Sequence, residues 1–367
     1  MKRIILIFLA VLISLPFFAQ RGVINIPDLE GYVTLKCDFH IHTVFSDGMV
    51  WPTIRIDEAY REGLDAIAIT DHIEYRPHRA DIPSSHNRSY EIAKPRAEER
   101  GIILIRGGEI TRSMPPGHSN AIFLNDADKL EQQNYTDAYL AAKEQNAFIF
   151  WNHPGWLRQQ PDTTMWWHEH TLLLQQGMLH GIEVAGNSAN VYYPEAHYWA
   201  LEKKLTMLGN SDIHDPIQAV VDFAAGKRRT MTLVFAKERT EEAIREALFE
   251  RRTAVYWKEY IIGEEKYLKE LFEKAVDIRV RKTDSNTVEI RFRNSSDLTF
   301  HLTKDDHDPR LTYLRNINVE PFIIEPNQTR TITVRLNNGI ESGNANFIIQ
   351  NFLSEPGKGM RYTVRID

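Results

Sequence analysis

The chain has 367 residues, 43% of them hydrophobic and 26% charged, which is the composition of an ordinary globular protein with room for two domains. A formal net charge of −6 argues against a general nucleic-acid binder, because affinity for polyanions depends on clustered Lys and Arg. The single cysteine, Cys37, leaves no intramolecular disulfide and is expected to be a small buried hydrophobe.

Residues 1–19 are predicted to be a secretory signal peptide. Lys2 and Arg3 precede an apolar run at 4–15, and Ala19 provides a small residue at a plausible cleavage point. The run is short for a membrane span of about 20 residues, so cleavage is favoured over a retained membrane anchor. We therefore expect an exported protein, periplasmic or secreted, without stable membrane insertion after cleavage. Loss of the two basic residues would change the net charge from −6 to −8.

Between residues 33 and 257, short apolar strands alternate with helical stretches. The predicted strands are 33–42, 65–70, 102–106, 121–124, 147–151, 182–185, 206–209 and 230–235. The predicted helices are 51–61, 91–100, 137–145, 194–203 and 241–251. Strand–helix alternation at this spacing is typical of parallel βα units. With this number of strands and this length, residues 30–260 are predicted to form an α/β fold, a distorted (β/α)7 barrel.

The pattern changes after a charged helix at 264–275. Short alternating strands follow at 277–281, 288–294, 298–302, 322–324, 331–336, 346–351 and 361–366, with turns rich in Asn, Ser, Asp, Gly and Pro between them. This spacing predicts a small all-β domain, an antiparallel β-sandwich over residues 276–367. Residues 261–275 are predicted to be a linker helix whose charged side chains are solvated.

Six histidines lie where predicted strands end, beside carboxylates or turn residues. His40 and His42 are two apart in a strand, so both imidazoles leave the same face, which in a barrel is the interior. Two imidazoles aimed at one point in an apolar strand need a shared partner, and a cation is the simplest. Asp212 and His214 repeat the same spacing at the end of a later strand.

Five more residues of the same chemical types follow this pattern. Glu109 comes after two glycines that are expected to let the backbone turn sharply, and its carboxylate could bridge two ions. His118 enters a strand after a glycine, and His153 ends one. Asp47 lies in a Ser-Asp-Gly turn and His72 in a Thr-Asp-His segment. Imidazole and carboxylate without thiolate suit Zn²⁺, Mn²⁺ or Fe²⁺ and argue against copper or iron–sulfur chemistry.

Taken in order, these motifs resemble those of the polymerase and histidinol phosphatase (PHP) superfamily. The motifs are His-x-His, Ser-Asp-Gly, Ile-Thr-Asp-His, Gly-Glu, a lone histidine at 118, Asn-His-Pro and Ser-Asp-x-His, and they cover about residues 34–255. The resemblance implies a distorted (β/α)7 barrel that carries two or three divalent metal ions and hydrolyses phosphoesters.

The resemblance also implies how the ligands divide among the ions. The expected groups are His40, His42, Glu109 and Asp212 for one ion, the shared Glu109 with His118 and His153 for a second, and Asp47, His72 and His214 for a third. Many members of the superfamily have a histidine where this chain has Asp47. A carboxylate there favours Mn²⁺ or Fe²⁺ at the third position.

Three residues are expected to act in catalysis. Glu109 would join two ions, and a hydroxide between them, formed near neutral pH, would be the nucleophile. Asp71 precedes a ligand and faces the other way along its strand, so it is expected to orient its neighbours rather than to bind metal. Arg112 is a candidate for a substrate oxygen contact, and Arg76 and Arg79 are further candidates.

Other histidines and basic residues are interpreted as structural. His168 and His170 lack a third ligand placed by strand geometry. Trp166 and Trp167 beside them are expected to cover the barrel mouth or to line a substrate pocket. Assigned to the surface are His78, His86, His197 and the basic run at 227–229, which is read as a solvated loop.

These features favour an exported metal-dependent phosphoesterase that acts on small phosphorylated substrates. Diesters are favoured over monoesters, because the chain also resembles exported PHP proteins with an appended C-terminal β domain, some of which are phosphodiesterases. Metal-dependent amide or lactone hydrolysis is one alternative, since amidohydrolase barrels also open with His-x-His and close with Asp. A non-catalytic binding protein, whose β-sandwich adheres to a glycan or a partner, is another. A proofreading exonuclease fits poorly with export and negative charge.

Overall fold

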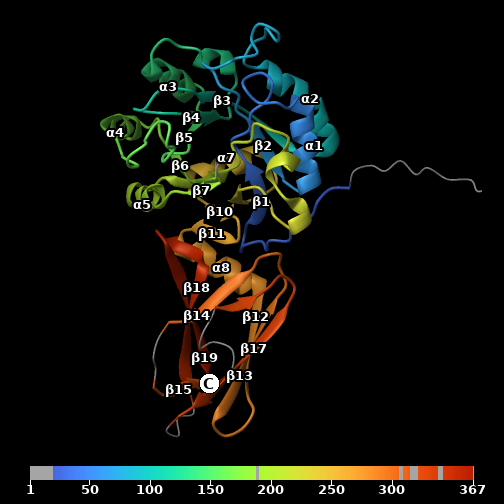
Figure 1. The fold of residues 1–367 in the computed structure, drawn as a ribbon, viewed down its shortest axis with the longest axis vertical. Helices are drawn as coiled ribbons and strands as arrows, with labels where there is room; N and C mark the ends of the chain where they lie inside the picture. Colours follow the sequence, from blue (N-terminus) through green and yellow to red (C-terminus); the bar gives the residue numbers. More distant parts are fainter. Residues whose placement is uncertain (1–19, 187–189, 306–308, 315–320, 338–341, 367) are drawn as a thin grey trace, which may run out of the picture.

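In the computed structural model, residues 20–186, 190–305, 309–314, 321–337 and 342–366 are described. They form an α/β domain and, below it in Figure 1, an all-β domain. The predicted signal peptide, residues 1–19, lies outside the described residues. Within the described ranges, no helix is long and apolar enough to cross a membrane. Cys37 is buried as a free thiol, as predicted.

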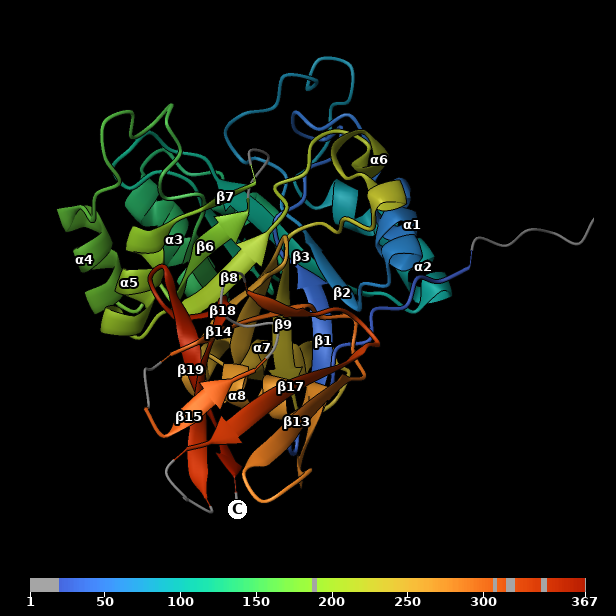
Figure 2. The same ribbon diagram turned by 60° about the horizontal axis from the view of Figure 1, so that its bottom comes forward.

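The α/β domain is built on one curved sheet (Figure 2). Its strands, in spatial order, are β9 (Met231–Ala236), β1 (Val33–Asp38), β2 (Ala66–Ile69), β3 (Ile103–Ile110), β4 (Ser119–Ile122), β5 (Phe148–Trp151), β6 (Gly181–Gly186) and β8 (Thr206–Asn210), with the short β7 (Val191–Tyr192) also on β6. Strands β2 and β5 are buried at every position, as expected for strands covered on both faces.

The two ends of this sheet meet through side chains. Thr232 Oγ1 of β9 donates to the Gly209 carbonyl of β8 over 2.9 Å. Thr253 Oγ1 of the next strand, β10 (Thr253–Trp257), donates to the Met207 carbonyl over 2.8 Å. The predicted α/β fold is therefore confirmed, as a distorted barrel that closes at this seam through side-chain hydrogen bonds.

Strand β4 is among the strands that depart from the expected parallel pattern, and it helps to build the site. Strand β4 is antiparallel to both β3 and β5, because the chain returns from β3 through a loop without a crossover helix. A reversed strand begins at the edge where its neighbours end. His118, which directly precedes β4, therefore lies at the same edge as Glu109 of β3 and His153 after β5. Strand β9 is also antiparallel to β1.

Helices flank the sheet in Figure 1. They are α1 (Pro52–Glu62), α2 (Arg88–Arg100), α3 (Tyr135–Glu144), α4 (His168–Gln175), α5 (Pro194–Lys203), α6 (Ile217–Val220) and α7 (Glu241–Phe249). Helix α1 begins with Pro52, whose missing N–H costs nothing in a first turn. It buries Ile56 and Ala59 and ends at Glu62, followed by Gly63, whose φ of 86° is the left-handed conformation that glycine adopts without strain.

The C-terminal domain is the predicted β-sandwich. One sheet contains β12 (Val276–Lys282), β13 (Thr287–Asn294), β17 (Thr329–Leu336) and β15 (Leu311–Tyr313), and the other contains β16 (Phe322–Ile324), β14 (Phe300–Lys304), β18 (Gly343–Glu355) and β19 (Lys358–Ile366). The rings of Phe292, Phe322 and Phe347 meet between the sheets, with the Phe292 ring centroid 6.0 and 5.8 Å from the other two. The alternating burial along β13 follows from one face packing on this core.

The two domains share a sheet and a helix. Strand β18 pairs in parallel with β11 (Tyr260–Gly263) of the upper domain, so hydrogen bonding continues from one domain into the other. Helix α8 (Glu265–Ala275) lies at this junction (Figure 1). It was expected to be a solvated linker, but Leu268, Leu271 and Phe272 are fully buried. Only its charged face meets solvent, because its apolar positions recur at helical spacing.

Candidate metal centre

The predicted ligands of the first group converge. His40 and His42 continue β1 in extended form, and Ile41 between them bridges to Ile213 beyond β8. His40 Nε2 and His42 Nε2 lie 3.2 and 3.1 Å from Asp212 Oδ1. The same two nitrogens lie 3.6 and 3.5 Å from the two oxygens of Glu109. Four ligands at 2.0–2.1 Å from a tetrahedral ion would be about 3.3–3.4 Å apart, so this geometry fits a cation.

Unsatisfied polar atoms point at the same place. His40 Nε2, His42 Nε2, Glu109 Oε2 and Asp47 Oδ1 are buried, and among the described residues none has a hydrogen-bond partner of acceptable geometry. Leaving a buried polar atom without a partner costs about 1–3 kcal/mol, so four together in a native fold require an explanation. Divalent cations held by these groups would supply the missing partners.

Glu109 stands at the middle of the centre. Its Oε1 lies 3.0 Å from His118 Nδ1 and 3.7 Å from His153 Nε2, as the second predicted group requires. Its Oε2 lies 2.6 Å from His72 Nδ1, although His72 was expected in the third group only. The Glu109 carboxylate is therefore positioned between the predicted ligand groups and can join them. The glycines before it do not make the expected turn: β3 continues through Gly107, where an added Cβ would lie 2.8 Å from Thr70 Cγ2.

The third predicted group also comes together. Asp47 Oδ1 lies 3.4 Å from His72 Nε2 and 3.2 Å from His214 Nε2. His42 Nδ1 lies 3.9 Å from the same oxygen, so His42 stands between the first and third groups. All nine predicted metal ligands thus belong to four overlapping groups whose donor atoms lie within 4.8 Å of one another. The sharing of His40, His42, His72 and Glu109 between groups is typical of a site for several ions.

Charges in the centre follow from this crowding. Burial lowers the pKa of His42 to about 3, so its imidazole is neutral and can act as a ligand. Burial alone would also lower the pKa of His40, but the carboxylates around it, Asp212 first, raise it well above its usual value. Burial would raise the pKa values of the three carboxylates Asp47, Glu109 and Asp212, but their histidine neighbours hold all three well below the usual range.

Two of the predicted ligands have strained backbone conformations. His153 and Asp212 have positive φ values of 29° and 51°, which residues other than glycine rarely adopt. Such strain persists only where the surroundings fix the conformation, and it concentrates at functional sites. At Asp212 the fixing contacts are made by the preceding residue, since Ser211 donates from its backbone N–H and its hydroxyl to Asp38 over 3.1 and 2.5 Å.

Asp71 holds the turn that follows His42 and does not lie among the metal-ligand groups. Its Oδ1 accepts from the Thr43 backbone N–H over 2.7 Å and from Ser46 Oγ over 2.8 Å. Ser46 Oγ in turn lies 3.4 Å from His42 Nδ1. Asp71 is thus placed as an orienting group, because it fixes the turn that carries Asp47 and reaches the imidazole of His42 through one hydroxyl.

Glu183 of β6 is a functional residue that the sequence reasoning missed. It is fully buried, and its Oε1 accepts from His40 Nδ1 over 2.9 Å and from Asn210 Nδ2 over 3.0 Å. Its Oε2 accepts from the backbone N–H of His153 over 2.7 Å. A carboxylate on Nδ1 places the proton there and leaves Nε2 free for a cation. A glutamate inside a predicted apolar strand was the signal that could have found it.

Asp38 and Arg229 form a buried ion pair beside His40 that was not predicted from the sequence. Arg229 was assigned to a solvated basic loop, which is wrong, since only 3% of it is exposed. Its Nη1 donates to Asp38 Oδ2 over 2.9 Å, and its other nitrogens bond the carboxylate of Glu62. Asp38 also accepts from the His40 backbone N–H over 3.3 Å. The arginine is buried because two carboxylates from distant parts of the chain neutralise it.

A cavity of 680 Å³ opens onto the centre. Its lining residues are Asp47, His72, Tyr75, Thr111, His118, His153, Trp156, Arg158, Asp212, Ile213, His214, Asp215 and Val220. Arg112 does not line it. The Arg112 guanidinium instead pairs with Glu74 over 2.7 Å and donates to the carbonyls of Gln132 and Gln133. Arg158 is the arginine that the structure places at the cavity.

Neither Arg76 nor Arg79 lines the cavity. Arg76 donates to the carbonyls of Phe45 and Ser84 over 3.2 and 3.0 Å, and Arg79 pairs with Glu131 over 3.7 Å. These two candidates for substrate contact therefore have structural partners elsewhere.

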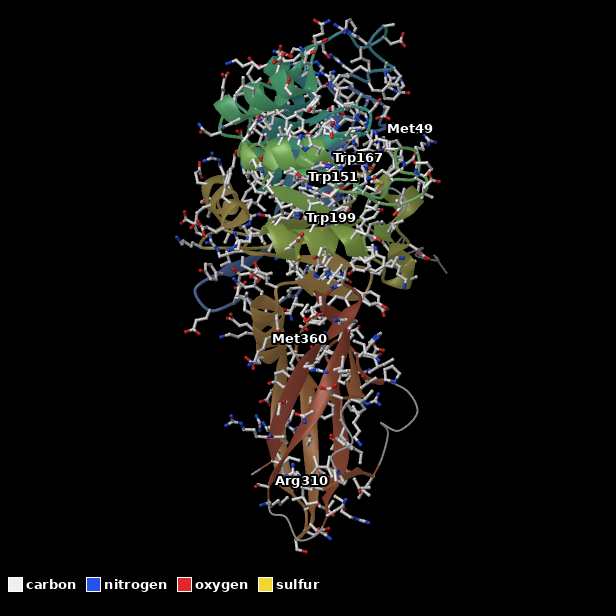
Figure 3. All side chains as sticks on the ribbon, turned by 90° about the vertical axis from the view of Figure 1, so that its left-hand side faces the viewer. Met49, Trp151, Trp167, Trp199, Arg310 and Met360 are labelled. Carbon is white, nitrogen blue, oxygen red and sulfur yellow. The ribbon has the colours of Figure 1, made fainter. Side chains whose placement is uncertain are left out.

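One histidine and one tryptophan lie elsewhere than expected. His197, assigned to the surface, is fully buried with its Nδ1 2.9 Å from the Tyr192 hydroxyl. Trp166 does not line the cavity and packs against Trp151 and Trp199 in the barrel wall, where Figure 3 labels the latter two. His170 was interpreted as structural and is buried, with its ring centroid 3.7 Å from that of Trp151. Its Nε2 donates to the backbone carbonyl of Pro116, just before His118.

Comparisons with known proteins agree with this architecture. A two-domain protein from Bacteroides vulgatus, described as containing a predicted PHP-like metal-dependent phosphoesterase, is 53% identical over 95% of this chain and 99% of that chain, with a TM-score of 0.91. Residues 274–365 match the model of an Ig-like domain family. No curated protein matches the chain.

Two further structures are more distant. A candidate metal-dependent phosphoesterase from Bifidobacterium adolescentis is 18% identical over 48% of this chain and 87% of that chain, with a TM-score of 0.39. An amidohydrolase from Chromobacterium violaceum, with bound sulfate and no metal, is 17% identical over 50% of this chain and 89% of that chain, with a TM-score of 0.38. TM-scores this low carry no argument about this chain.

Proposed function

The chain belongs to the family of two-domain proteins with a PHP-like metal-dependent phosphoesterase domain, and from this premise we propose that it is an exported hydrolase of phosphoric esters. It would act on small phosphorylated substrates, diesters in preference to monoesters. Two or three divalent ions of zinc, manganese or iron would be its cofactors.

The observation that carries this proposal is the convergence of nine imidazole and carboxylate side chains with four unsatisfied buried atoms among them. A protein that used the barrel only as a scaffold would have no reason to keep these atoms without partners. The donor set contains nitrogen and oxygen without sulfur, which fits Zn²⁺, Mn²⁺ or Fe²⁺.

Divalent ions in these groups would supply Lewis acidity and neutralise charge on phosphoryl oxygens. The residues of the chain provide the geometry for that chemistry. Glu109 holds two groups together through its two oxygens. Glu183 fixes the tautomer of His40, and Asp71 fixes the turn that carries Asp47. Because these side chains are buried and held by hydrogen bonds, the ligands need no rearrangement when a substrate enters.

The charge of the cavity supports the preference for diesters. When its histidines are neutral, as metal binding requires, its lining offers one cationic side chain, Arg158, against the carboxylates of Asp47, Asp212 and Asp215. A diester carries one negative charge near neutral pH, whereas a monoester carries close to two. With a single arginine among these acids, the more weakly charged substrate is easier to accommodate outside the metal groups.

The test is hydrolysis of mono- and bis-p-nitrophenyl phosphate by protein of measured metal content. We expect release of p-nitrophenol from both, faster from the diester. The double variant His40→Ala/His42→Ala should lose at least one ion per chain by elemental analysis, together with the activity. His78→Ala, an exposed histidine outside the centre, is the matched control. Turnover of neither ester by metal-loaded protein would favour a binding protein, and cleavage only of amides or lactones would favour the amidohydrolase alternative.

Export is part of the proposal and has its own test. The basic start, short apolar run and Ala19 of the sequence support removal of residues 1–19. Expression of the full chain in a bacterium should yield a periplasmic or secreted protein whose mass corresponds to a start at Gln20. Retention of residues 1–19 in the cytoplasmic fraction would contradict export while leaving the hydrolase proposal untouched.

A further inference from the structure

The cavity above the metal centre has walls that the metal ligands do not supply. Its volume of 680 Å³ falls within the range of sites for organic ligands, about 300–1,000 Å³. Beyond the ligands, its lining includes Tyr75, Trp156, Arg158 and Val220. These side chains are available to contact the organic part of a phosphoester, next to the phosphoryl group at the metals.

Two aromatic rings flank the ligand groups on different sides. The Trp156 ring centroid lies 5.5 Å from the His118 ring and 5.2 Å from the His153 ring, both of the second group. The Tyr75 ring centroid lies 5.8 Å from the ring of His72, which belongs to the third group. Trp156 is half-buried and Tyr75 is 53% exposed. A substrate seated at the ions would therefore meet an aromatic ring close to the scissile bond.

Arg158 adds a positive charge on the Trp156 side. Its guanidinium carbon lies 5.7 Å from the centre of the Trp156 ring, within the range of a cation–π contact. Throughout the described ranges, no carboxylate forms an ion pair with Arg158, unlike Arg112 with Glu74. An exposed arginine without a carboxylate partner, beside an indole at the cavity, is available to an anionic ligand.

We propose that the substrate carries a planar ring beside its phosphoryl group and that this ring packs against Trp156, while Arg158 attracts the anionic group. The inference rests on the proposed function for the choice of a phosphoester as ligand. It makes Trp156 a specificity-determining residue that selects ring-bearing esters over short alkyl esters. Aromatic pairs contribute enough beyond area burial for a preference of about fivefold to tenfold.

The first experiment measures binding of two hydrolysis-resistant probes, phenylphosphonate and methylphosphonate, to the metal-loaded protein by isothermal titration calorimetry. The wild-type protein should bind the phenyl compound about fivefold to tenfold more tightly. Trp156→Ala should bring the ratio of the two affinities close to one, and Trp156→Phe should keep most of it. Arg158→Gln should weaken both probes by a similar factor, because charge acts on the phosphonate and not on the ring.

The matched control is Leu157→Ala, which changes the next residue of the same loop. Leu157 is 72% exposed and does not line the cavity, so the affinity ratio should stay at the wild-type value. Equal affinity of the wild-type protein for the two probes would overturn the inference. So would a preference for the phenyl compound that survives Trp156→Ala.

A kinetic measurement separates this inference from the proposed function. For bis-p-nitrophenyl phosphate, Trp156→Ala should raise KM about fivefold to tenfold with little change in kcat, since the ring contact is made before and during reaction alike. Loss of kcat with unchanged KM would overturn the substrate role of Trp156. Tight, Trp156-dependent binding of phenylphosphonate without turnover of any phosphoester would overturn the proposed hydrolysis and leave the ring site supported.

Discussion

Arg55 Nε donates a hydrogen bond of 2.9 Å to the backbone carbonyl of His42. Helix α1 thereby fixes the main chain of a predicted metal ligand. Arg55 is only 1% exposed, and its guanidinium makes five hydrogen bonds in all. Its other acceptors are the Glu58 carboxylate and the carbonyls of Ile213, His214 and Asp215. One side chain therefore ties the first ligand segment to the last.

This relationship predicts a strong effect of replacing Arg55. Arg55→Met would leave the Glu58 carboxylate buried without its partner, and we expect it to lower the free energy of unfolding by about 3–5 kcal/mol in a urea titration. Arg55→Lys keeps the charge but has no planar fork for the carbonyls, so it should fold and bind metal about 10–100-fold more weakly. Arg61→Lys, on the exposed face of the same helix, is the control. Wild-type metal affinity in Arg55→Lys would contradict the clamp.

Glu183→Gln should weaken metal binding without unfolding the barrel. The amide keeps the shape of the side chain but cannot hold His40 Nδ1 in its donor form as firmly, because it lacks the charge. The loss expected for a group that orients a ligand is about 10–100-fold in metal affinity or activity. Affinity measured with a metal-buffered titration, beside a thermal melt, checks both parts. Glu195→Gln, exposed in α5, should match the wild type. An unfolded Glu183→Gln would point to a structural role instead.

Metal binding should release protons, and His72 is the residue to follow. Burial alone would lower the pKa of His72, but Glu109 and Asp47 raise it to about 10 in the metal-free protein. A bound imidazole must be neutral, so a cation entering this group displaces the proton, and affinity should rise as pH rises towards about 10. Calorimetry near pH 8 in two buffers of different ionisation enthalpy measures the protons released.

The raised pKa of His72 also determines how the folding stability of the metal-free protein depends on pH. Stabilisation by protonated His72 is complete below the ordinary pKa of 6.5 and is lost as pH rises through about 10.

Asp47→Asn is the variant that tests the proton release. It keeps an oxygen ligand but removes one of the charges that raise the pKa of His72, so metal binding should release fewer protons. Metal binding with no proton release at this pH would contradict the charge state assigned to His72.

Replacement of two adjacent arginines should lower the free energy of unfolding by very different amounts. Arg229→Met leaves Asp38 and Glu62 buried and unpaired, so the free energy of unfolding should fall by about 3–5 kcal/mol. Arg228→Met removes only a partly exposed pair with Asp297 at 3.4 Å and should cost about 0–1 kcal/mol. Urea denaturation followed by tryptophan fluorescence measures both. Equal losses in the two variants would refute the assignment of Arg229 to a buried network.

The spacing of apolar and turn residues predicted both domains, because a barrel strand and a sandwich strand differ in periodicity along the chain itself. The same local information placed His40, His42 and Asp212 at strand ends, and the carboxyl ends of neighbouring strands meet in space whatever the detailed packing. Glu183 also ends up at this edge, but a single buried glutamate has no motif around it. A glutamate in an apolar strand could have marked the position, but only the structure, which places it 2.9 Å from His40, shows what it holds.

The chain order of imidazoles and carboxylates thus predicted by itself a set of metal-ligand side chains, and the structure brings the donor atoms of all nine into overlapping groups. Tertiary structure alone decided which charged side chains are buried and what each one holds. Arg229 meets an acid 191 residues away in the chain, whereas Arg112 turns from the cavity towards Glu74. The physical reason is that secondary structure follows from neighbours within a few residues, while the burial of a charge depends on partners that only the folded chain brings close.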